Sequence, residues 1–190
     1  MIDYTYWQYR LRGRIAPQEI DYRPIRLERY ANFLIGVQKM DAQREEHFKQ
    51  LLADFQASPD KSLRWLFQPQ GEIVLSKNLN KLSEDNLMLL GLANGINEVY
   101  FDEHDLVYMI CPLEKLDDLC EILALDGVII AQALKSYRPE GLLEIYEKRT
   151  AQKVFNFCQR LCREEYIVDM CADFAIGEIW AEEFEQNTGK

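Results

Sequence analysis

Two histidines are present in the sequence, and neither lies in a pattern that supports catalysis. Nucleophilic catalysis by serine or cysteine would need one of these imidazoles as its base. His47 stands beside two glutamates in a predicted helix, where a solvated side chain is the simpler interpretation. His104 lies in the acidic run 102–105, whose side chains could together bind a divalent cation. Because a short polar turn splays its side chains apart, we favour a turn over a metal site.

Neighbouring carboxylates elsewhere in the chain are predicted surface charges. Asp117-Asp118 and Glu164-Glu165 each fall in a helical pattern, in which consecutive side chains point about 100° apart. Acid–base catalysis would need carboxylates that converge on a substrate, and neither pair does so. Gly91 and Gly95 do not form a phosphate-binding loop, because they fall within and at the end of a predicted helix. We therefore expect no catalytic residues and no cofactor.

Five cysteines form an odd set without the spacing of a secreted disulfide framework, which indicates reduced thiols. Cys158 and Cys162 lie four residues apart on one predicted helix, and Cys171 could supply a third ligand to a metal ion. Since both helical cysteines fall on an apolar stripe, burial is the simpler interpretation. We expect no metal site.

The composition predicts a globular protein with an acidic surface. Hydrophobic residues make up 48% of the 190 residues, and the formal net charge is −10. No apolar run approaches the roughly 20 residues that span a bilayer, and the N-terminus lacks a signal-peptide pattern, so we expect a cytoplasmic protein without membrane contact. Binding to nucleic acid draws its free energy from lysine and arginine, so the net charge argues against nucleic acid as the main partner.

Charge is distributed unevenly along the chain. Residues 10–29 hold six arginines against three acids, whereas 163–190 hold eight acids against two basic residues. The arginines of the N-terminal segment alternate with tyrosines, a pattern that can stack on bases or can pack as aromatic core under arginine stems. Given the acidity of the chain, we favour packing.

The periodicity of apolar residues divides the chain into three segments. Residues 1–70 contain an aromatic and arginine-rich start, of which 6–15 fit a strand or a short helix, followed by amphipathic helices over 26–57. Residues 140–190 return to helical spacing, with apolar positions from Val154 to Cys171 and a last short helix near Trp180. We expect both segments to pack on the middle one.

The middle segment, 71–139, reads as strand, helix, strand, strand, helix, strand. The predicted strands are 72–76, 98–101, 106–111 and 128–133, with a hairpin connection at 102–105. Ser83 and Pro112 begin the two helices, and Gly95 and Gly127 end them. This order predicts an α+β fold, a ferredoxin-like βαββαβ antiparallel sheet flanked by N-terminal and C-terminal helices.

Residues 82–139 carry further features in a characteristic order. An acidic helix start after Leu82 is followed by the helix end at Gly95, the acidic hairpin, the helix entry Pro112-Leu113-Glu114 and Pro139. In this series the segment resembles the acidic ferredoxin-like domain of the YebC-type regulator and translational-activator family. The resemblance implies a regulatory binding module without catalytic residues. That family begins with a lysine-rich helical domain that contacts nucleic acid, and residues 1–70 show no such stretch.

We predict a non-enzymatic binding or regulatory protein whose acidic surface engages a protein partner, including a basic one. The exposed edge strands of such a sheet also suggest a homodimer. Two alternatives stay open: an immunity or inhibitor protein against a basic toxin or nucleic-acid enzyme, and an enzyme whose site is assembled from distant residues near His104. The predicted partner-binding residues are Asp102, Glu103, His104, Asp105, Asp117, Asp118 and Glu121.

Overall fold

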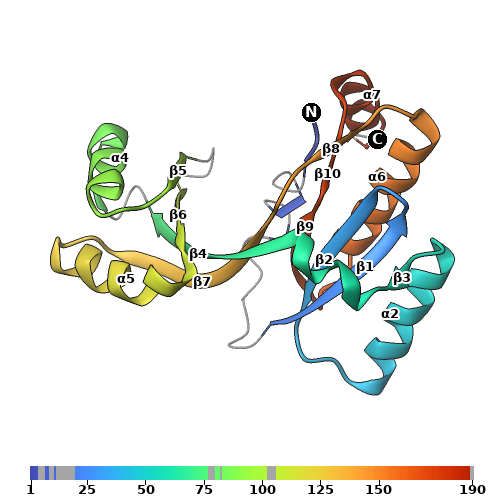
Figure 1. Ribbon diagram of the computed structural model, residues 1–190, viewed down its shortest axis with the longest axis horizontal. Helices are drawn as coiled ribbons and strands as arrows, with labels where there is room; N and C mark the ends of the chain where they lie inside the picture. Colours follow the sequence, from blue (N-terminus) through green and yellow to red (C-terminus); the bar gives the residue numbers. More distant parts are fainter. Residues whose placement is uncertain are drawn as a thin grey trace. The chain divides into compact units, whose positions relative to one another are not determined.

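A computed structural model describes residues 1–3, 7, 8, 11, 20–76, 80, 81, 83–101 and 106–188 (Figure 1). The chain forms two compact units. The outer unit consists of Met1–Gln68 together with Arg138–Lys190, and the inserted unit is Pro69–Tyr137. The first and last segments of the chain therefore fold together, where the sequence analysis treated 1–70 and 140–190 as separate flanks of the middle segment.

A four-stranded sheet lies at the centre of the outer unit. β1 (Asp21–Glu28) and β2 (Ala31–Val37) form an antiparallel hairpin, and β9 (Ile167–Ala172) pairs antiparallel with β2. The short β3 (Ser58–Pro59) completes the order β3-β1-β2-β9. A parallel pair of strands, β8 (Leu143–Ile145) and β10 (Phe174–Ile176), forms a second small sheet.

α-Helices follow several of these strands. α2 (Ala42–Asp54) follows β2, α6 (Lys148–Cys162) follows β8, and α7 (Glu178–Thr188) follows β10. A short 3-10 helix, η1 (Lys61–Leu66), leads into the inserted unit. Among the described residues, no helix is long and apolar enough to cross a membrane.

The helical prediction for 26–57 is wrong over its first part, because residues 21–37 form the β1–β2 hairpin. Every residue of β2 is buried, since β2 lies between two strands and is covered on its faces. A strand buried on both faces has no polar alternation, and its continuous apolar run also satisfies a helical template. Residues 167–176 were expected to be helical for the same reason and instead form β9 and β10.

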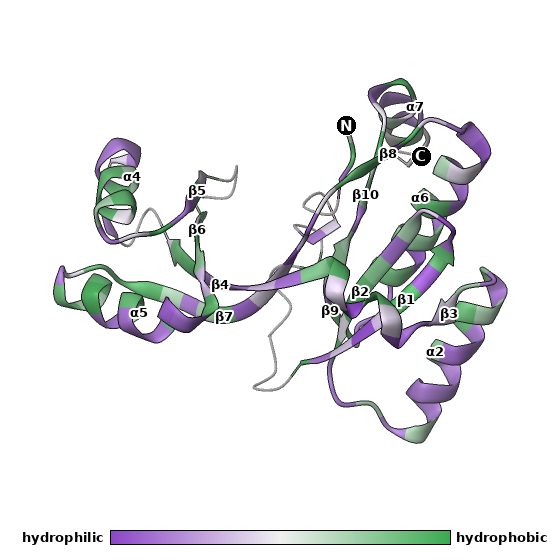
Figure 2. Ribbon diagram, in the orientation of Figure 1, coloured by the Kyte–Doolittle hydropathy of each residue, from purple (hydrophilic) through white to green (hydrophobic). Residues whose placement is uncertain are grey.

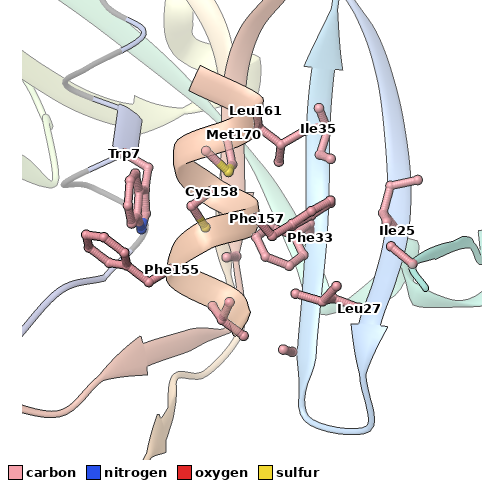
Figure 3. Close-up of a cluster of buried hydrophobic side chains, with 14 of the residues drawn as sticks. Trp7, Ile25, Leu27, Phe33, Ile35, Phe155, Phe157, Cys158, Leu161 and Met170 are labelled. Carbon is pink, nitrogen blue, oxygen red and sulfur yellow. The ribbon is translucent and has the colours of Figure 1, made fainter. Parts of the chain in front are cut away.

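Helix α6 packs its apolar face on this sheet (Figure 3). Phe157 on α6 contacts Phe33 on β2 edge-on, with ring centroids 5.1 Å apart. On the other side of the helix, Phe155 contacts Trp7 at 5.2 Å. Trp7 is fully buried, so for this aromatic residue the prediction of packing is confirmed. The apolar stripe predicted around Cys158 and Cys162 is therefore the core-facing side of α6.

Two buried aspartates on β9 and just beyond it hold the sheet together. Asp169 accepts a hydrogen bond from the Tyr22 hydroxyl at 2.8 Å. Asp173 accepts two from Asn32, one from the backbone N–H at 2.8 Å and one from the side-chain amide at 2.6 Å. Because a buried carboxylate needs hydrogen-bond donors, each aspartate fixes β9 against the β1–β2 hairpin.

The inserted unit has the predicted βαββαβ order. It consists of β4 (Phe67–Ser76), α4 (Glu84–Ala93), β5 (Glu98–Phe101), β6 (Leu106–Pro112), α5 (Leu116–Leu125) and β7 (Ile130–Pro139). A short 3-10 turn, η2 (Leu113–Lys115), precedes α5. The strand order is β5-β6-β4-β7, and β6 runs antiparallel to both of its neighbours. The α+β class and the split βαβ arrangement are therefore confirmed.

The predicted helix ends of the inserted unit are also confirmed. The Ser83 hydroxyl accepts the backbone N–H of Asn86 at 3.3 Å, as an N-cap does. Gly95 and Gly127 each adopt a φ of +81°, the left-handed conformation that ends a helix. The apolar sides of both helices, which include Leu87 and Leu123, share one core with β4 and β6. Figure 2 shows α4 coloured mainly as hydrophobic beyond its acidic first turn.

Candidate functional site

The predicted acidic site is only partly described. Residues 102–105, with His104 among them, lie outside the described residues. Asp117, Asp118 and Glu121 all lie on α5 and are exposed to solvent. Asp117 and Glu121 are one helical turn apart and share a face. The acidic face of α5 as a partner-binding surface stays a prediction.

Three of the cysteines are buried in the core, and His47 lies beside a glutamate. Cys158 and Cys171 are fully buried, and burial raises the pKa of both thiols well above the usual value. His47 Nε2 lies 3.2 Å from a carboxylate oxygen of Glu164 on the surface. Within the described part of the chain, no group of three or more His, Cys, Asp or Glu side chains is arranged to hold a metal ion.

The exposed side of α6 is basic. Its buried positions include Ala151, Val154 and Cys158, whereas Lys148, Arg149 and Asn156 are exposed and Lys153 is partly exposed. The first helical turn carries Lys148 and Arg149 and no acidic residue. Cations at a helix N-terminus are electrostatically unfavourable, because the exposed N–H groups there already attract anions. Helix stability therefore does not account for this arrangement.

These residues line an open pocket of about 590 Å³, which we call the basic pocket. Lys153 Nζ lies 2.6 Å from Glu28 Oε1, and Lys148 Nζ lies 2.8 Å from Glu183 Oε1. Arg149 is exposed and has no carboxylate partner among the residues that the structure describes. The charge of Arg149 is therefore available to an anionic ligand. The basic pocket is lined by Phe55, Lys148, Arg149, Gln152, Lys153 and Asn156.

A second pocket, of about 390 Å³, lies next to the first. Two tyrosines line it: Tyr30 in the β1–β2 turn and Tyr146 between β8 and α6, which are 56% and 68% exposed. The Arg29 guanidinium lies over the Tyr30 ring, 5.0 Å from its centroid. We call this the tyrosine pocket. It is lined by Glu28, Arg29, Tyr30, Leu143, Glu144, Ile145, Tyr146, Glu147 and Thr150.

Three carboxylates border the tyrosine pocket, and each has a partner. Glu28 pairs with Lys153 of the basic pocket. The Tyr146 hydroxyl donates to Glu144 at 2.5 Å, and this hydrogen bond raises the pKa of Tyr146 above its usual value. Glu147 accepts a hydrogen bond from the Thr150 hydroxyl. The Glu28–Lys153 pair joins the two pockets into one continuous surface.

This surface was not predicted from the sequence, because the net charge of the whole chain does not reveal it. A local signal was present: residues 142–163 hold five basic residues against two acidic ones. Recognising it would have required knowing that Lys148, Arg149 and Lys153 share the solvent side of α6 with the pocket. The aromatic partner Tyr30 comes from a turn more than one hundred residues earlier, which no local pattern can reveal.

Comparison with known proteins places the chain in a family. The model of the family described as TACO1/YebC second and third domain matches residues 45–174. A "probable transcriptional regulatory protein" of Desulfitobacterium hafniense is 27% identical over 99 residues, covering 52% of this chain and 39% of that relative. One of the same description from Methylacidiphilum infernorum is 26% identical over 113 residues, covering 60% and 44%. The chain thus spans less than half the length of these relatives.

The fold also has a counterpart among solved structures. The crystal structure of a conserved hypothetical protein, Aq1575 from Aquifex aeolicus, matches 84% of this chain and 66% of its own with a TM-score of 0.65. The sequences are 21% identical over this match, so the likeness concerns the fold.

These findings correct one expectation. Transcriptional regulation takes place on nucleic acid, so relatives of that description overturn the prediction that nucleic acid is not a partner. The prediction relied on the net charge of −10, and the net charge of a whole chain does not describe its local surfaces. The regulatory class predicted from the sequence agrees with the relatives' names. With 130 of its 190 residues matched by the family model, the chain belongs to the TACO1/YebC family.

Proposed function

We propose that this protein is a regulatory protein that binds nucleic acid through the exposed face of α6. The observation that carries the proposal is the basic pocket, where Lys148, Arg149 and Lys153 lie together in a chain of strongly negative net charge. Arginine and lysine side chains contact phosphate oxygens and position a nucleic-acid strand without reading its sequence. The names of the relatives supply the second line of support.

The character of the binding follows from how these charges are paired. Arg149 is available, whereas Lys148 and Lys153 each already contact a glutamate that an incoming phosphate must displace. Two to three phosphate contacts predict a slope of log K against log salt of about −2 to −3 on duplex DNA. Such binding is weak at physiological salt.

Fluorescence anisotropy with a labelled oligonucleotide tests the proposal. The variant K148Q/R149Q should weaken binding about tenfold or more at low salt and reduce the salt slope by about one to two. The matched control is Lys61→Gln on η1, an exposed lysine on a different element of the outer unit, and it should bind within about twofold of the wild type. Equal affinity for wild type and double variant would contradict the proposal.

A second candidate function rests on the acidic face of α5. Exposed Ile122 and Leu125 follow Asp117, Asp118 and Glu121 on this helix, and Leu125 is 87% exposed. Protein interfaces combine an apolar centre with a charged rim, so this helix suits a protein partner. In-cell crosslinking should then yield a partner that is lost in Leu125→Asp and kept in Leu142→Asp, an exposed leucine of the outer unit. Crosslinks that Leu125→Asp does not change would refute this candidate.

A further inference from the structure

We propose that the tyrosine pocket takes one unstacked base of a single-stranded nucleic acid. This inference rests on the proposed function and adds the class of ligand: a single strand, rather than a duplex, with a base inserted between Tyr30 and Tyr146. The pocket volume of about 390 Å³ lies within the range of roughly 300–1,000 Å³ that small-molecule pockets show. A base with part of its sugar belongs to that size class.

The tyrosines offer a stacking surface. Both are more than half exposed although each carries a large aromatic ring. Tyr30 lies between β1 and β2 with the Arg29 guanidinium over its ring, and Tyr146 lies between β8 and α6 with its hydroxyl bonded to Glu144. Aromatic side chains of this kind stack with bases in proteins that bind single strands. In a duplex the faces of the bases are already stacked on one another, so the tyrosines reach a base only when the strand is single or the base is extruded.

The neighbouring basic pocket fixes the path of the strand. Lys153 borders the tyrosine pocket through its pair with Glu28, and Arg149 lies within the first turn of the same helix. A base in the tyrosine pocket therefore brings its own or the adjacent phosphate toward α6. One surface then supplies the two elements of single-strand recognition, an electropositive track for the backbone and an aromatic site for a base.

Carboxylates at the pocket predict which bases it accepts. Glu144 and Glu147 line the tyrosine pocket, and each already accepts one hydrogen bond, from Tyr146 and Thr150, which leaves further lone pairs to accept another. Adenine, cytosine and guanine carry exocyclic amino groups that offer two N–H donors to carboxylates, whereas unpaired uracil and thymine offer only the single ring N3–H. The carboxylates also repel a phosphate, so the pocket accepts the base and leaves the backbone outside. We therefore expect oligo(A) and oligo(C) to bind more tightly than oligo(U) of equal length.

Anisotropy measurements on three probes test this inference: a labelled mixed A/C single strand, its duplex and an oligo(U) of the same length. The wild type should prefer the A/C strand over both others by about tenfold. Tyr146→Ala should lose about tenfold on the A/C strand and change little on the duplex. Tyr146→Phe keeps the ring and should retain most of the affinity. The matched control is Trp65→Ala, which removes an aromatic residue that is 67% exposed on η1.

The outcomes separate the two proposals. If the duplex binds as tightly as the single strand, or if Tyr146→Ala changes nothing while K148Q/R149Q weakens binding, the base pocket is wrong and the α6 interface stands. If Trp65→Ala and Tyr146→Ala lose affinity equally, the base pocket is also refuted. If the wild type binds none of the probes at low salt, the proposed function itself fails.

Discussion

Lys153 Nζ on α6 lies 2.6 Å from Glu28 Oε1 at the end of β1. This ion pair stands between the basic pocket and the tyrosine pocket, because Lys153 lines the first and Glu28 lines the second. It ties the start of the helix to the hairpin turn that carries Tyr30. The position of the lysine charge is thereby fixed, and part of that charge is withheld from an incoming phosphate.

Glu28→Gln should therefore tighten binding to nucleic acid. The substitution releases Lys153 and removes one negative charge beside the phosphate path, so we expect a gain of about two- to fivefold at low salt, measured by anisotropy. Stability should change by less than about 1 kcal/mol, because both side chains are partly exposed. Glu46→Gln, which also removes one exposed carboxylate but in the N-terminal half of α2, is the control and should leave affinity nearly unchanged. Weaker binding by Glu28→Gln would contradict the role given to this pair.

The stability of the outer unit should depend on the protonation of Asp173. Burial raises the pKa of this carboxyl above its usual 3.8, although the hydrogen bonds from Asn32 act in the opposite direction. Between these two pKa values the folded protein holds a proton that the unfolded chain has lost. The contribution of Asp173 to the free energy of unfolding therefore falls as the pH rises from the usual pKa to the raised pKa of the folded protein. Above the raised pKa this contribution no longer changes with pH.

Urea denaturation of wild type and Asp173→Asn at several pH values from 4 upward measures this effect. The free energy of unfolding of the wild type, minus that of the variant, should fall as the pH rises and then level off. All other groups titrate alike in both proteins, so the difference isolates Asp173. A difference that is independent of pH would show that the environment of Asp173 does not shift its protonation.

Phe157→Ala should destabilise the outer unit by about 3–5 kcal/mol. The ring is fully buried and meets Phe33 and Phe55 edge-on, at 5.1 and 5.2 Å. Removing it leaves a cavity under the helix that carries the basic pocket. Phe157→Leu fills part of the cavity and should lower the free energy of unfolding by clearly less than Phe157→Ala. Thermal and urea denaturation of both variants measure this difference. Equal losses for the two variants would indicate that the site collapses around the missing ring.

Gly95→Ala and Gly127→Ala should each destabilise the inserted unit by about 1–2 kcal/mol. Both glycines have a φ of +81° and no neighbouring atom within 4 Å of an added Cβ, so the cost is backbone strain alone. Gly141→Ala also enters open space and has no positive φ, which makes it the control with little expected change. Urea denaturation compares the three. A loss at Gly141 as large as that at Gly95 would remove backbone strain as the explanation.

The sequence predicted the inserted unit well because local rules determine it. The Ser83 cap, the left-handed glycines and the alternation of strands and amphipathic helices are signals within a few residues of one another. The outer unit was predicted less well, since the paired residues of β2 and β9 lie 130 to 139 positions apart in the sequence. A strand such as Ala31–Val37, buried on both faces, gives no local pattern that separates it from a helix.

The candidate site escaped prediction for a related reason. Tyr30, Tyr146 and Arg149 carry no motif, and only the folding of the hairpin against the start of α6 brings them together. The net charge of the chain sums the basic residues of this surface with the more numerous acidic residues elsewhere, so it hides a local basic patch. The prediction that Asp117, Asp118 and Glu121 bind a partner also relied on the net charge of the chain. These residues are exposed on α5.

Photocrosslinking with peptide mapping tests most directly where nucleic acid binds. A single-stranded A/C oligonucleotide with a photoreactive base is crosslinked to the wild-type protein, which is then digested and analysed by mass spectrometry. Crosslinks are expected in the peptides that contain Tyr30 and residues 142–156, and they should be lost in K148Q/R149Q. Crosslinks confined to the inserted unit, 69–137, would contradict the proposed interface on α6.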